Sequence, residues 1–451
     1  MNILVVANNF TNGGFEKHIE NYNKYLKGKI SFVYAFGHYE ENNYLKGCKK
    51  YSISNEPTLQ ALYDNINCLV DIIRKEKIDA IHVHPFTCVF PAIFASQLTG
   101  VPIFYTVHGF ASLNGYYSLN DEILFRYFLS DLKPLVFSVS KEYFKTLEYK
   151  YMTSNYRHLP NSMDSSKFSK IECVKNNKWL LISRLDEDKK GEIIELFKNF
   201  KDLKIELDIV GDGTCRKELE KLAKKLKISS IVNFKGRKSD IAKELEVGYN
   251  GVIGLGQVVL EGLMSNLPVL LIGYGKITGL VDKELYGELK DINFVNRFFD
   301  SRFDLDEFLN INDNIEKYQL RDIAKNDFDI KNAVKIYYDA IKELKFTDSM
   351  PLKKVYRDLE EKIKDENVGT ELMIDSVSFF NILQEDLLRF IADPDLRSCF
   401  HHKQILYLHD IIDRQQTIIG ELQYQLDSFK DNVGLRTIIK NTTKHLHRKN
   451  K

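Results

Sequence analysis

Short runs of β-branched and aromatic residues alternate with stretches of helical period, and this alternation occurs twice along the chain. Strands that are each followed by a helix form parallel sheets with crossover helices. The runs of the first series lie at 2–7, 30–36, 80–84, 103–108 and 135–140. After a polar linker, the runs of the second series lie at 179–183, 205–211, 231–236, 251–256, 268–273 and 293–296. The sequence therefore predicts an α/β protein with two parallel-sheet domains.

We place the domain boundaries where these patterns change. The first domain covers 1–165 and the second covers 176–345, and the polar segment between them has little to bury. The strand signal then stops, so 346–429 is predicted to be a helical extension, followed by a basic amphipathic tail at 430–451. Ligands of open α/β sheets bind beyond the carboxyl ends of the strands. A cleft between the two sheets is therefore where we expect a site.

Charge and cysteine usage exclude several classes of protein. The chain has 451 residues, with 64 Lys and Arg against 63 Asp and Glu, and a net charge of +1 gives no reason to expect nucleic-acid binding. The six cysteines are scattered without a C-x-x-C pair, which argues against a zinc site or a disulfide framework. No apolar run reaches the ~18 residues of a membrane span, and the run at 3–7 is too short for a signal peptide. We expect a cytoplasmic protein.

Two features of the C-terminal region concern partners. Apolar residues recur at coiled-coil-like spacing over 408–429, which suits a homo-oligomer or, equally, packing against the body of the protein. The segment 430–451 carries seven Lys or Arg against one acid, Asp431, with apolar residues among them. As a helix it would lie on an anionic membrane surface, at the inner face of the plasma membrane; the alternative is a solvated basic terminus. It lacks the interleaved aromatic residues typical of nucleic-acid binding.

A pair of glycines, Gly13 and Gly14, stands between the first predicted strand and the first predicted helix. Glycines at a strand-to-helix turn let backbone N–H groups approach an anion at the helix N-terminus. The complete G-x-G-x-x-G pattern is absent, so a plain tight turn is the alternative and a nicotinamide dehydrogenase is disfavoured.

Charged residues follow the first strand of the second domain. Arg184 leaves the end of this strand, and Lys189 comes five residues later at the start of a helix. A guanidinium and an ammonium that converge on one cleft suit a diphosphate, and the alternative is a solvated charged turn.

A second glycine-containing turn, at 254–256, opens a helix whose N-terminal amides are expected to face the cleft. Glu261 lies on this helix among apolar residues. A carboxylate in so apolar a stretch needs a partner, because its unpaired burial is costly. A ribose diol offers two hydroxyl donors to its two oxygens, and a structural salt bridge is the alternative.

Together these residues resemble the retaining nucleotide-sugar glycosyltransferases of family 4. The resemblance implies the GT-B fold, in which two Rossmann-like domains face a cleft. It runs in order through about residues 1–345. The motifs that carry it are Gly13-Gly14, the H-x-H at 82–84, TVHG at 106–109, PNSMD at 160–164, SRLDEDKKG at 183–191, GDG at 211–213 and VVLEGLMSNLPVL at 258–270. Any one of these motifs is weak, but their shared order is specific.

The resemblance implies a role for each matching residue of the second domain. Glu261 matches the glutamate that holds the nucleotide ribose. Arg184 and Lys189 match the basic pair that binds the donor diphosphate and stabilises the departing nucleotide. The amides of Gly256 and Gln257 would meet the phosphates at the helix N-terminus.

In the first domain, Gly13 and Gly14 match the glycines that approach the donor phosphates or the acceptor. His108 matches the histidine that faces the transferred sugar, and a purely structural histidine is the alternative. His82 and His84 share one face of a strand, which would suit a pair of metal ligands. The family pattern accounts for both of them, so no metal site is predicted.

One departure from the family concerns Ile253, which stands eight residues before Glu261, where the family usually has another glutamate. That glutamate contacts the hydroxyls of the donor sugar. Some relatives have a G-x-G-R-type sequence here, and 254–257 is similar to that variant. The substitution leaves the identity of the sugar, and activity itself, open.

The resemblance implies transfer of a hexose or N-acetylhexosamine from a nucleotide diphosphate, with UDP expected, to an acceptor hydroxyl with retention of configuration. The acceptor would be a glycan, a lipid-linked molecule or a protein in bacterial surface polysaccharide, wall polymer or glycoprotein synthesis. No D-x-D stands at a strand end that faces the expected cleft, so we expect neither a metal nor another cofactor. Two other interpretations stay open: an inactive glycosyltransferase-like partner subunit, and a GT-B-fold nucleotide-sugar epimerase.

Overall fold

The structure, a computed structural model, falls into two compact units, Met1–Ser349 and Met350–Lys451. Each is described here by itself. The described residues are 1–10, 14–39, 45, 47–56, 58–114, 124–172, 174, 176–203, 205–297 and 299–364. Within the second unit they form one helix, α15 (Met350–Lys364). The predicted segments 408–429 and 430–451 lie outside the described residues.

The N-terminal half of the first unit is built on a sheet of seven strands in the order β3-β2-β1-β4-β5-β6-β7, all parallel. Its central strand β1 has a run of buried residues from Ile3 to Ala7, as expected for a parallel strand covered on both faces. The strands are β1 (Asn2–Phe10), β2 (Ser31–Tyr39), β3 (Lys49–Ser52), β4 (Ala80–Val83), β5 (Ile103–Val107), β6 (Leu135–Ser138) and β7 (Tyr156–His158).

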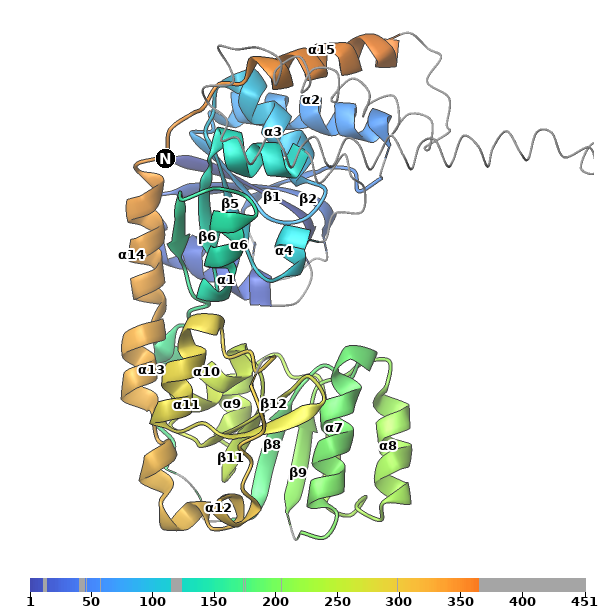
Figure 1. Ribbon diagram of the computed structural model, residues 1–451, viewed down its shortest axis with the longest axis vertical. Coiled ribbons are helices and arrows are strands. Elements are labelled where there is room, and N and C mark those ends of the chain that lie inside the picture. The colour runs from blue at the N-terminus through green and yellow to red at the C-terminus, as the bar shows by residue number, and fades with distance from the viewer. Residues whose placement is uncertain are drawn as a thin grey trace, which may run out of the picture. The chain divides into compact units, whose positions relative to one another are not determined.

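Helices connect these strands in the crossover pattern that the sequence predicts (Figure 1). The longest, α2, begins where Thr58 accepts a hydrogen bond from the amide of Ala61 and ends where Lys77 takes the left-handed conformation. The helices of this half are α1 (Gly14–Tyr25), α2 (Leu59–Glu76), α3 (Val89–Thr99), α4 (Ala111–Asn114) and α6 (Phe144–Tyr149), with the 3-10 turn η3 at Lys141–Tyr143.

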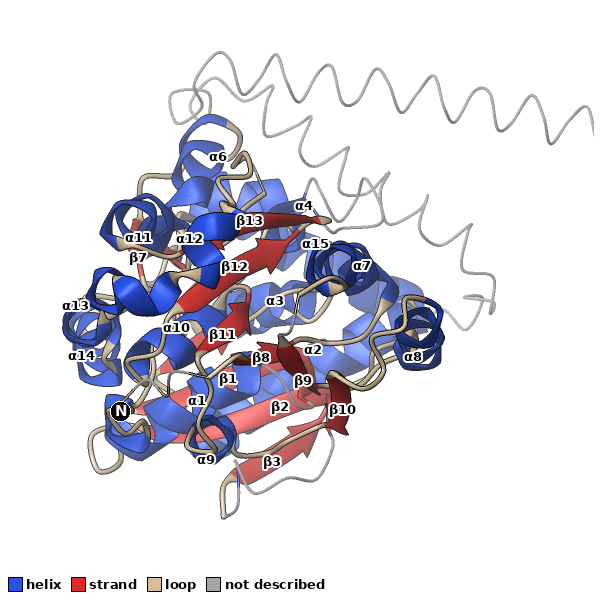
Figure 2. Cartoon of the chain, turned by 90° about the horizontal axis from the view of Figure 1, so that it is seen from below, coloured by secondary structure: helices blue, strands red, loops and turns tan. Residues whose placement is uncertain are grey.

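The C-terminal half of this unit is built on a sheet of six strands in the order β10-β9-β8-β11-β12-β13. All neighbours are parallel except β12 and β13, which form an antiparallel hairpin at one edge (Figure 2). The strands are β8 (Lys178–Ile182), β9 (Glu206–Val210), β10 (Val232–Gly236), β11 (Gly251–Gly254), β12 (Val269–Gly273) and β13 (Lys276–Leu280).

Two buried apolar clusters, one around Leu263 and Val252 and one around Trp179 and Leu196, pack around this sheet. The helices that contribute to them or cap them are α7 (Glu187–Phe200), α8 (Arg216–Lys225), α9 (Ile241–Leu245), α10 (Gln257–Met264), α11 (Lys283–Leu289), α12 (Leu305–Leu309) and α13 (Arg321–Phe328), with the 3-10 turn η5 at Lys290–Ile292.

The predicted helix at the end of this series exists as α14 (Ile330–Ile341), but its apolar face belongs to the N-terminal core. Ala333 and Tyr337 are buried there with residues of β1 and β2, and the rings of Tyr22 and Tyr337 lie 4.6 Å apart. The chain thus returns from the second sheet to the first (Figure 1), and α14 ties the two halves together.

The sequence pattern predicted most of the strands and failed at the edges. The run at 293–296 is not a strand, because Asn293 and Phe294 have φ of 59° and 53°, values that no strand accommodates. The short strands β3, β7 and β13 were not anticipated. They lie at sheet edges, where a strand has a neighbour on one side only and needs a weaker apolar pattern.

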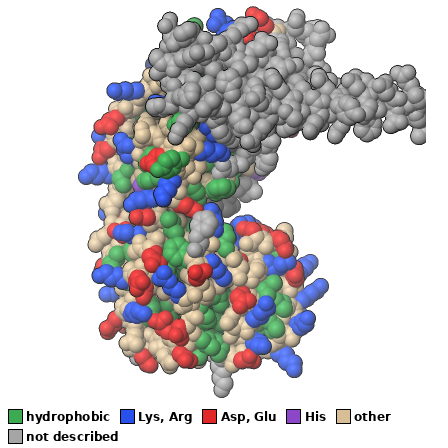
Figure 3. All heavy atoms as spheres, viewed as in Figure 1, with side chains coloured by type: hydrophobic (Ala, Val, Ile, Leu, Met, Phe, Trp, Pro, Cys, Tyr) green, Lys and Arg blue, Asp and Glu red, His purple; other side chains and the backbone are tan. Residues whose placement is uncertain are grey.

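On the face seen in Figure 3, acidic and basic side chains are interspersed over the C-terminal half. Among the described residues, no helix has the length and apolar character needed to cross a membrane.

Candidate functional site

A cavity of about 620 Å³ opens between the two halves of the first unit. The N-terminal half contributes Glu20 on α1 and the segment Ser162–Asp164 that follows β7. The C-terminal half contributes the segment 239–243, which follows β10 and runs into the first turn of α9, together with Gln257 and Glu261 on α10. Several of the wall residues therefore follow the carboxyl ends of parallel strands, where ligands of such sheets bind.

Two residues predicted to hold the donor, Gln257 and Glu261, line this cavity on one helix. Glu261 is 3% exposed, so its carboxylate lies in the wall of the cavity rather than in bulk water. Helix α10 begins at Gln257 because Gly256 has φ of 62°, a conformation that side-chain-bearing residues rarely adopt. At Gly254, a Cβ would lie 2.3 Å from a methyl carbon of Val258, so only glycine fits there.

The amide of Gly256 has a partner within the fold, since it donates a hydrogen bond to the carbonyl of Phe294 at 3.3 Å. The next amides in the helix are those of Gln257 and Val258, and the amide of Val258 donates back to Leu255. Of the two amides predicted to meet a phosphate at this turn, that of Gly256 is thus used within the fold.

Arg184 follows β8 as predicted, but its guanidinium is held by its own loop. Nη1 lies 2.9 Å from Asp186 and Nη2 lies 2.8 Å from Asp188, and the side chain is 64% exposed. Arg184 is not among the residues that line the cavity. To contact a ligand there, its guanidinium has to leave these two carboxylates.

Lys189 lies in the first turn of α7 and shares one neighbour with Arg184, since its ammonium is 3.9 Å from Asp188. Its ammonium is 3.8 Å from Glu192 and 5.4 Å from the centre of the Tyr274 ring. Glu192 is buried and also accepts a hydrogen bond from the amide of Gly275 at 3.2 Å. Glu192 thus lies against both Lys189 and the β12–β13 turn, and Asp188 brings the cationic groups of Arg184 and Lys189 to one carboxylate.

His108 follows β5 and shares a hydrogen bond of 2.8 Å with a second histidine, from its Nε2 to Nδ1 of His84. Burial lowers the pKa of His108 to about 4, so its ring is neutral near pH 7. The ring of His82 contacts that of His84. Its two nitrogens form hydrogen bonds with the hydroxyls of Thr106 at 2.8 Å and of Tyr337 at 3.1 Å. The histidines are therefore part of one polar cluster beneath the carboxyl edge of the N-terminal sheet.

Gly14 is the first residue of α1, as predicted from the strand-to-helix turn. Its neighbour Gly13 lies outside the described residues.

Ile253, which stands where the related family has a glutamate, lies in the interior of the C-terminal sheet. It belongs to β11, pairs with Leu181 and Leu270, and is fully buried in the cluster around Trp179. A carboxylate at this position would be desolvated among apolar side chains, at a cost of several kcal/mol. The hydrophobic residue is what this packing requires.

One group of described residues has the side-chain types of a metal site: Glu187, Cys215 and Glu218. The ammonium of Lys190 lies 2.6 Å from Glu187 and 3.3 Å from Glu218. A cation of the protein therefore already stands between these carboxylates. Whether the reaction uses a metal stays a prediction.

The sequence reasoning missed several residues at the site. Asp164 lines the cavity and is buried, and Lys24 on α1 lies 2.8 Å from its carboxylate. Burial alone would raise the pKa of Asp164, but hydrogen bonds from Lys24 and Ser166 outweigh it and hold the pKa below its usual range. The PNSMD motif already contained Asp164, so the signal was present.

The missed segment at 239–243 begins in the charged turn GRKSD (236–240) that follows the strand at 231–236. Asp240 caps α9 by accepting a hydrogen bond from the amide of Lys243 at 3.1 Å. A charged turn after a predicted strand was the available signal, as it was for Arg184.

Residues 12–166 match the sequence model of Glycosyltransferase Family 4. No curated protein sequence matches the chain. Among solved structures, a glycosyltransferase from Rickettsia africae is similar with a TM-score of 0.59 at 16% identity, covering 76% of this chain and 99% of that one. HepE from Anabaena in complex with UDP-glucose is similar with a TM-score of 0.58 at 16% identity, covering 76% of this chain and 100% of that one.

A third similar structure is sucrose-phosphate synthase from Thermosynechococcus elongatus, with a TM-score of 0.55 at 12% identity, covering 76% of this chain and 98% of that one. At such identities the likeness establishes the fold. The prediction of two α/β domains in the GT-B arrangement is confirmed.

Proposed function

We propose that the protein is a retaining glycosyltransferase that moves a hexose or N-acetylhexosamine from a UDP-linked donor to an acceptor hydroxyl. The observation that carries this proposal is Glu261, a buried carboxylate in the wall of a cavity of about 620 Å³ to which both halves contribute. That volume suits a nucleotide-sized ligand. The match of residues 12–166 to Glycosyltransferase Family 4 and the structure of HepE with UDP-glucose support the same choice.

In this proposal the donor nucleotide occupies the cavity. Glu261 accepts hydrogen bonds from the two ribose hydroxyls, each of which is strengthened by the charge of the carboxylate. The amide of Gln257, at the N-terminus of α10, meets a phosphate oxygen where the helix dipole favours negative charge.

The chemical step breaks the bond between the anomeric carbon and the diphosphate oxygen, and the electron pair stays on the diphosphate. The acceptor oxygen bonds to the same face of the anomeric carbon, and its proton passes to the departing diphosphate. Lys189 and Arg184 stabilise the negative charge that develops there, with Arg184 turning away from its loop carboxylates. Because these cations supply the charge, we expect the reaction to need no metal.

His108 faces the transferred sugar in this proposal. As a neutral ring it exchanges hydrogen bonds with sugar hydroxyls without adding charge beside an oxocarbenium-like centre, where a second positive charge would be unfavourable. Closure of the two halves over the donor would exclude water and protect it from hydrolysis.

The class of acceptor is inferred from the C-terminal sequence and from one similar structure. We propose a glycan, lipid-linked or protein acceptor in bacterial surface polysaccharide, wall polymer or glycoprotein synthesis, at the inner face of the plasma membrane. Support comes from the basic segment 430–451 and from a similar structure titled as the lipopolysaccharide outer core galactosyltransferase WaaB.

A second candidate is an inactive glycosyltransferase-like partner subunit, and Ile253 is the observation that favours it. The side chain that contacts the donor sugar in the related family is missing at this position. Turnover of a nucleotide sugar by the purified chain separates the two candidates. Product formed from the donor alone would point instead to an epimerase.

Calorimetric titration with a panel of UDP-, GDP- and ADP-linked sugars, with and without EDTA, tests the proposal. We expect saturable binding of a UDP-sugar that EDTA does not change and that Glu261→Gln weakens. Glu284→Gln, on the exposed surface of α11, is the matched control. Absence of binding to any nucleotide sugar would contradict the proposal, and binding abolished by EDTA would contradict its metal independence.

A further inference from the structure

Two exposed aromatic side chains from different halves of the first unit flank one guanidinium. Phe110 follows β5 and is 53% exposed, and Tyr274 follows β12 and is 45% exposed. The guanidinium carbon of Arg297 lies 6.0 Å from the centre of the Phe110 ring and 5.4 Å from that of Tyr274. Large aromatic side chains exposed in one place mark surfaces that bind something.

The backbone holds Tyr274 where it is. Tyr274 and Gly275 form the two-residue turn between β12 and β13, with φ of 53° and 75°. A tyrosine in the left-handed region is unfavourable, and such strain is retained where a side chain has to be held in a set place. The buried carboxylate of Glu192 fixes the turn through the amide of Gly275, and Lys189 lies over the same ring.

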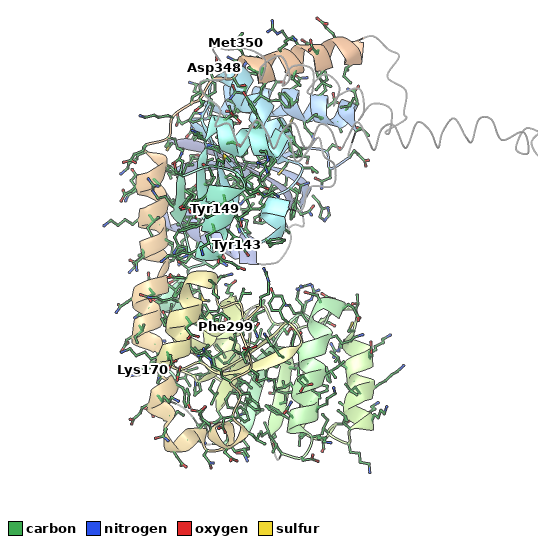
Figure 4. The ribbon with its side chains drawn as sticks, viewed as in Figure 1. Tyr143, Tyr149, Lys170, Phe299, Asp348 and Met350 are labelled. Atoms are coloured by element: carbon green, nitrogen blue, oxygen red, sulfur yellow. The ribbon has the colours of Figure 1, made fainter. Side chains whose placement is uncertain are left out.

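Both halves also hold Arg297. Its Nη1 lies 3.4 Å from Glu142 on η3, and its Nη2 lies 3.3 Å from the hydroxyl of Tyr274. A second ion pair between the two halves joins Lys141 on η3 to Asp291 on η5 at 2.9 Å. Figure 4 labels Tyr143, the residue after Glu142, at the end of the N-terminal half that lies toward the C-terminal sheet. The surface is complete only when both halves are in place.

One residue of each half connects this surface to the proposed reaction centre. Phe110 comes two residues after His108, and the ring of Tyr274 lies 5.4 Å from the ammonium of Lys189. A group bound across the two rings would therefore lie next to the transferred sugar and the leaving diphosphate.

We propose that Phe110, Tyr274, Arg297 and Glu142 form the acceptor subsite, and that the acceptor presents a neutral sugar ring there. The apolar C–H face of a pyranose packs against aromatic rings, while its hydroxyls exchange hydrogen bonds with a guanidinium and a carboxylate. Because Glu142 compensates the charge of Arg297, a neutral ring fits this surface better than a phosphate does. This inference rests on the proposed function and narrows its acceptor to a glycan.

Saturation-transfer NMR of the full chain tests the subsite with methyl hexopyranosides and methyl N-acetylglucosaminide as probes, and with glycerol 3-phosphate as the anionic probe. We expect transfer to the ring C–H protons of at least one methyl glycoside. Phe110→Ala and Tyr274→Asn should each weaken its binding at least tenfold. Asparagine tolerates the left-handed backbone, so this variant removes the ring without new strain. Tyr149→Ala, which removes an exposed tyrosine of α6 (Figure 4), is the matched control.

Calorimetric titration with a UDP-sugar is run on the same variants to separate the two proposals. The subsite is supported if glycoside binding falls while the dissociation constant of the UDP-sugar stays within about twofold for Phe110→Ala. It is overturned if no methyl glycoside binds, if the variants bind it as the wild type does, or if glycerol 3-phosphate binds more tightly and depends on Arg297. Failure of UDP-sugar binding alone would overturn the donor proposal and leave a glycan-binding surface.

Discussion

The two halves of the first unit present different chemistry at the carboxyl ends of their sheets. The C-terminal half presents ions: the cations Arg184 and Lys189 and the carboxylate Glu261. The N-terminal half presents the ion pair of Asp164 with Lys24 after β7 and, after β4 and β5, the imidazoles of His84 and His108; burial lowers the pKa of His108 to about 4. Charge is thus concentrated where a diphosphate and a ribose are proposed to bind, and uncharged polar groups stand where the sugar is proposed to lie.

Two carboxylates away from the site, one in each half, also differ in how their charge is compensated. In the C-terminal half, Asp208 lies 3.1 Å from both Lys178 and Lys235 and accepts a hydrogen bond from Tyr249 at 2.9 Å. In the N-terminal half, Asp131 is half-buried, and its burial outweighs the nearby Lys133 and raises its pKa. Asp208 is therefore compensated by cations, and Asp131 is not. Three predictions on activity and binding, from the largest expected effect to the smallest, and one on stability test these comparisons.

The largest effect is expected from Lys189→Met. Removing a cation that stabilises the developing charge on the diphosphate should lower kcat about 100- to 1000-fold, the range measured when one such preorganised group is removed. The dissociation constant of the UDP-sugar should change much less, because the interaction is strongest in the transition state. Steady-state kinetics and calorimetric titration on the same preparations measure both.

Lys190→Met is the matched control for Lys189. The side chains of the two lysines are exposed to a similar extent, 22% and 20%, but Lys190 is paired with Glu187 and Glu218. Equal losses of activity in both variants would show that the positive charge of α7 matters as a whole, and the assignment to Lys189 would fail.

Glu261→Gln is expected to weaken binding of UDP by about 10- to 100-fold, because two hydrogen bonds to a charged carboxylate become weaker ones to an amide. The role in ribose binding is tested with 2′,3′-dideoxy-UDP. The wild type should bind this analogue more weakly than it binds UDP. Glu261→Gln should bind the two almost equally, because the substitution has already weakened the hydrogen bonds to the ribose. Additive losses would mean that Glu261 does not contact the ribose.

The sequence predicted the fold because the fold depends on a repeated pattern. Each buried parallel strand must be apolar on both faces, so runs such as 179–183 and 268–273 stand out against their flanking helices. The prediction failed at 293–296, where the residue types favour a strand but Asn293 and Phe294 are left-handed. There the carbonyl of Phe294 accepts a hydrogen bond from the amide of Gly256, a long-range contact that a local pattern does not report.

The site was predictable only in part, for a related reason. Parallel topology places the ends of strands together, so Arg184, Gln257 and Glu261 were found from strand ends and a helix start. Topology does not determine which side chains form ion pairs, so the pairing of Arg184 with Asp186 and Asp188 was not predicted. Arg297 donates a hydrogen bond to Glu142, which is 155 residues away in the sequence, and neither residue belongs to a motif.

A smaller effect is expected from His108→Asn, which should lower kcat about tenfold, the value of one lost hydrogen bond in the transition state. UDP affinity should be unchanged. Because the pKa of His108 is about 4, the wild-type rate should show no inflection from this residue between about pH 5.5 and 8. His158→Asn, in β7, is the control. An inflection near pH 6.5 that disappears only in His108→Asn would contradict the neutral ring.

The last prediction concerns stability and compares the two carboxylates Asp131 and Asp208. Burial raises the pKa of Asp131 from 3.8 to about 7, so between these values the folded state binds more protons than the unfolded state. Stability is then lost as pH rises through that window. Asp131→Asn should stabilise the protein by about 2 kcal/mol at pH 8 and by little at pH 4.5, measured by urea unfolding. Asp208→Asn should destabilise it at pH 8, because hydrogen bonds from Asn233 and Tyr249 and its lysine partners outweigh burial and lower the pKa of Asp208. Equal signs for the two variants at pH 8 would mean that the lysines beside Asp208 do not set it apart from Asp131.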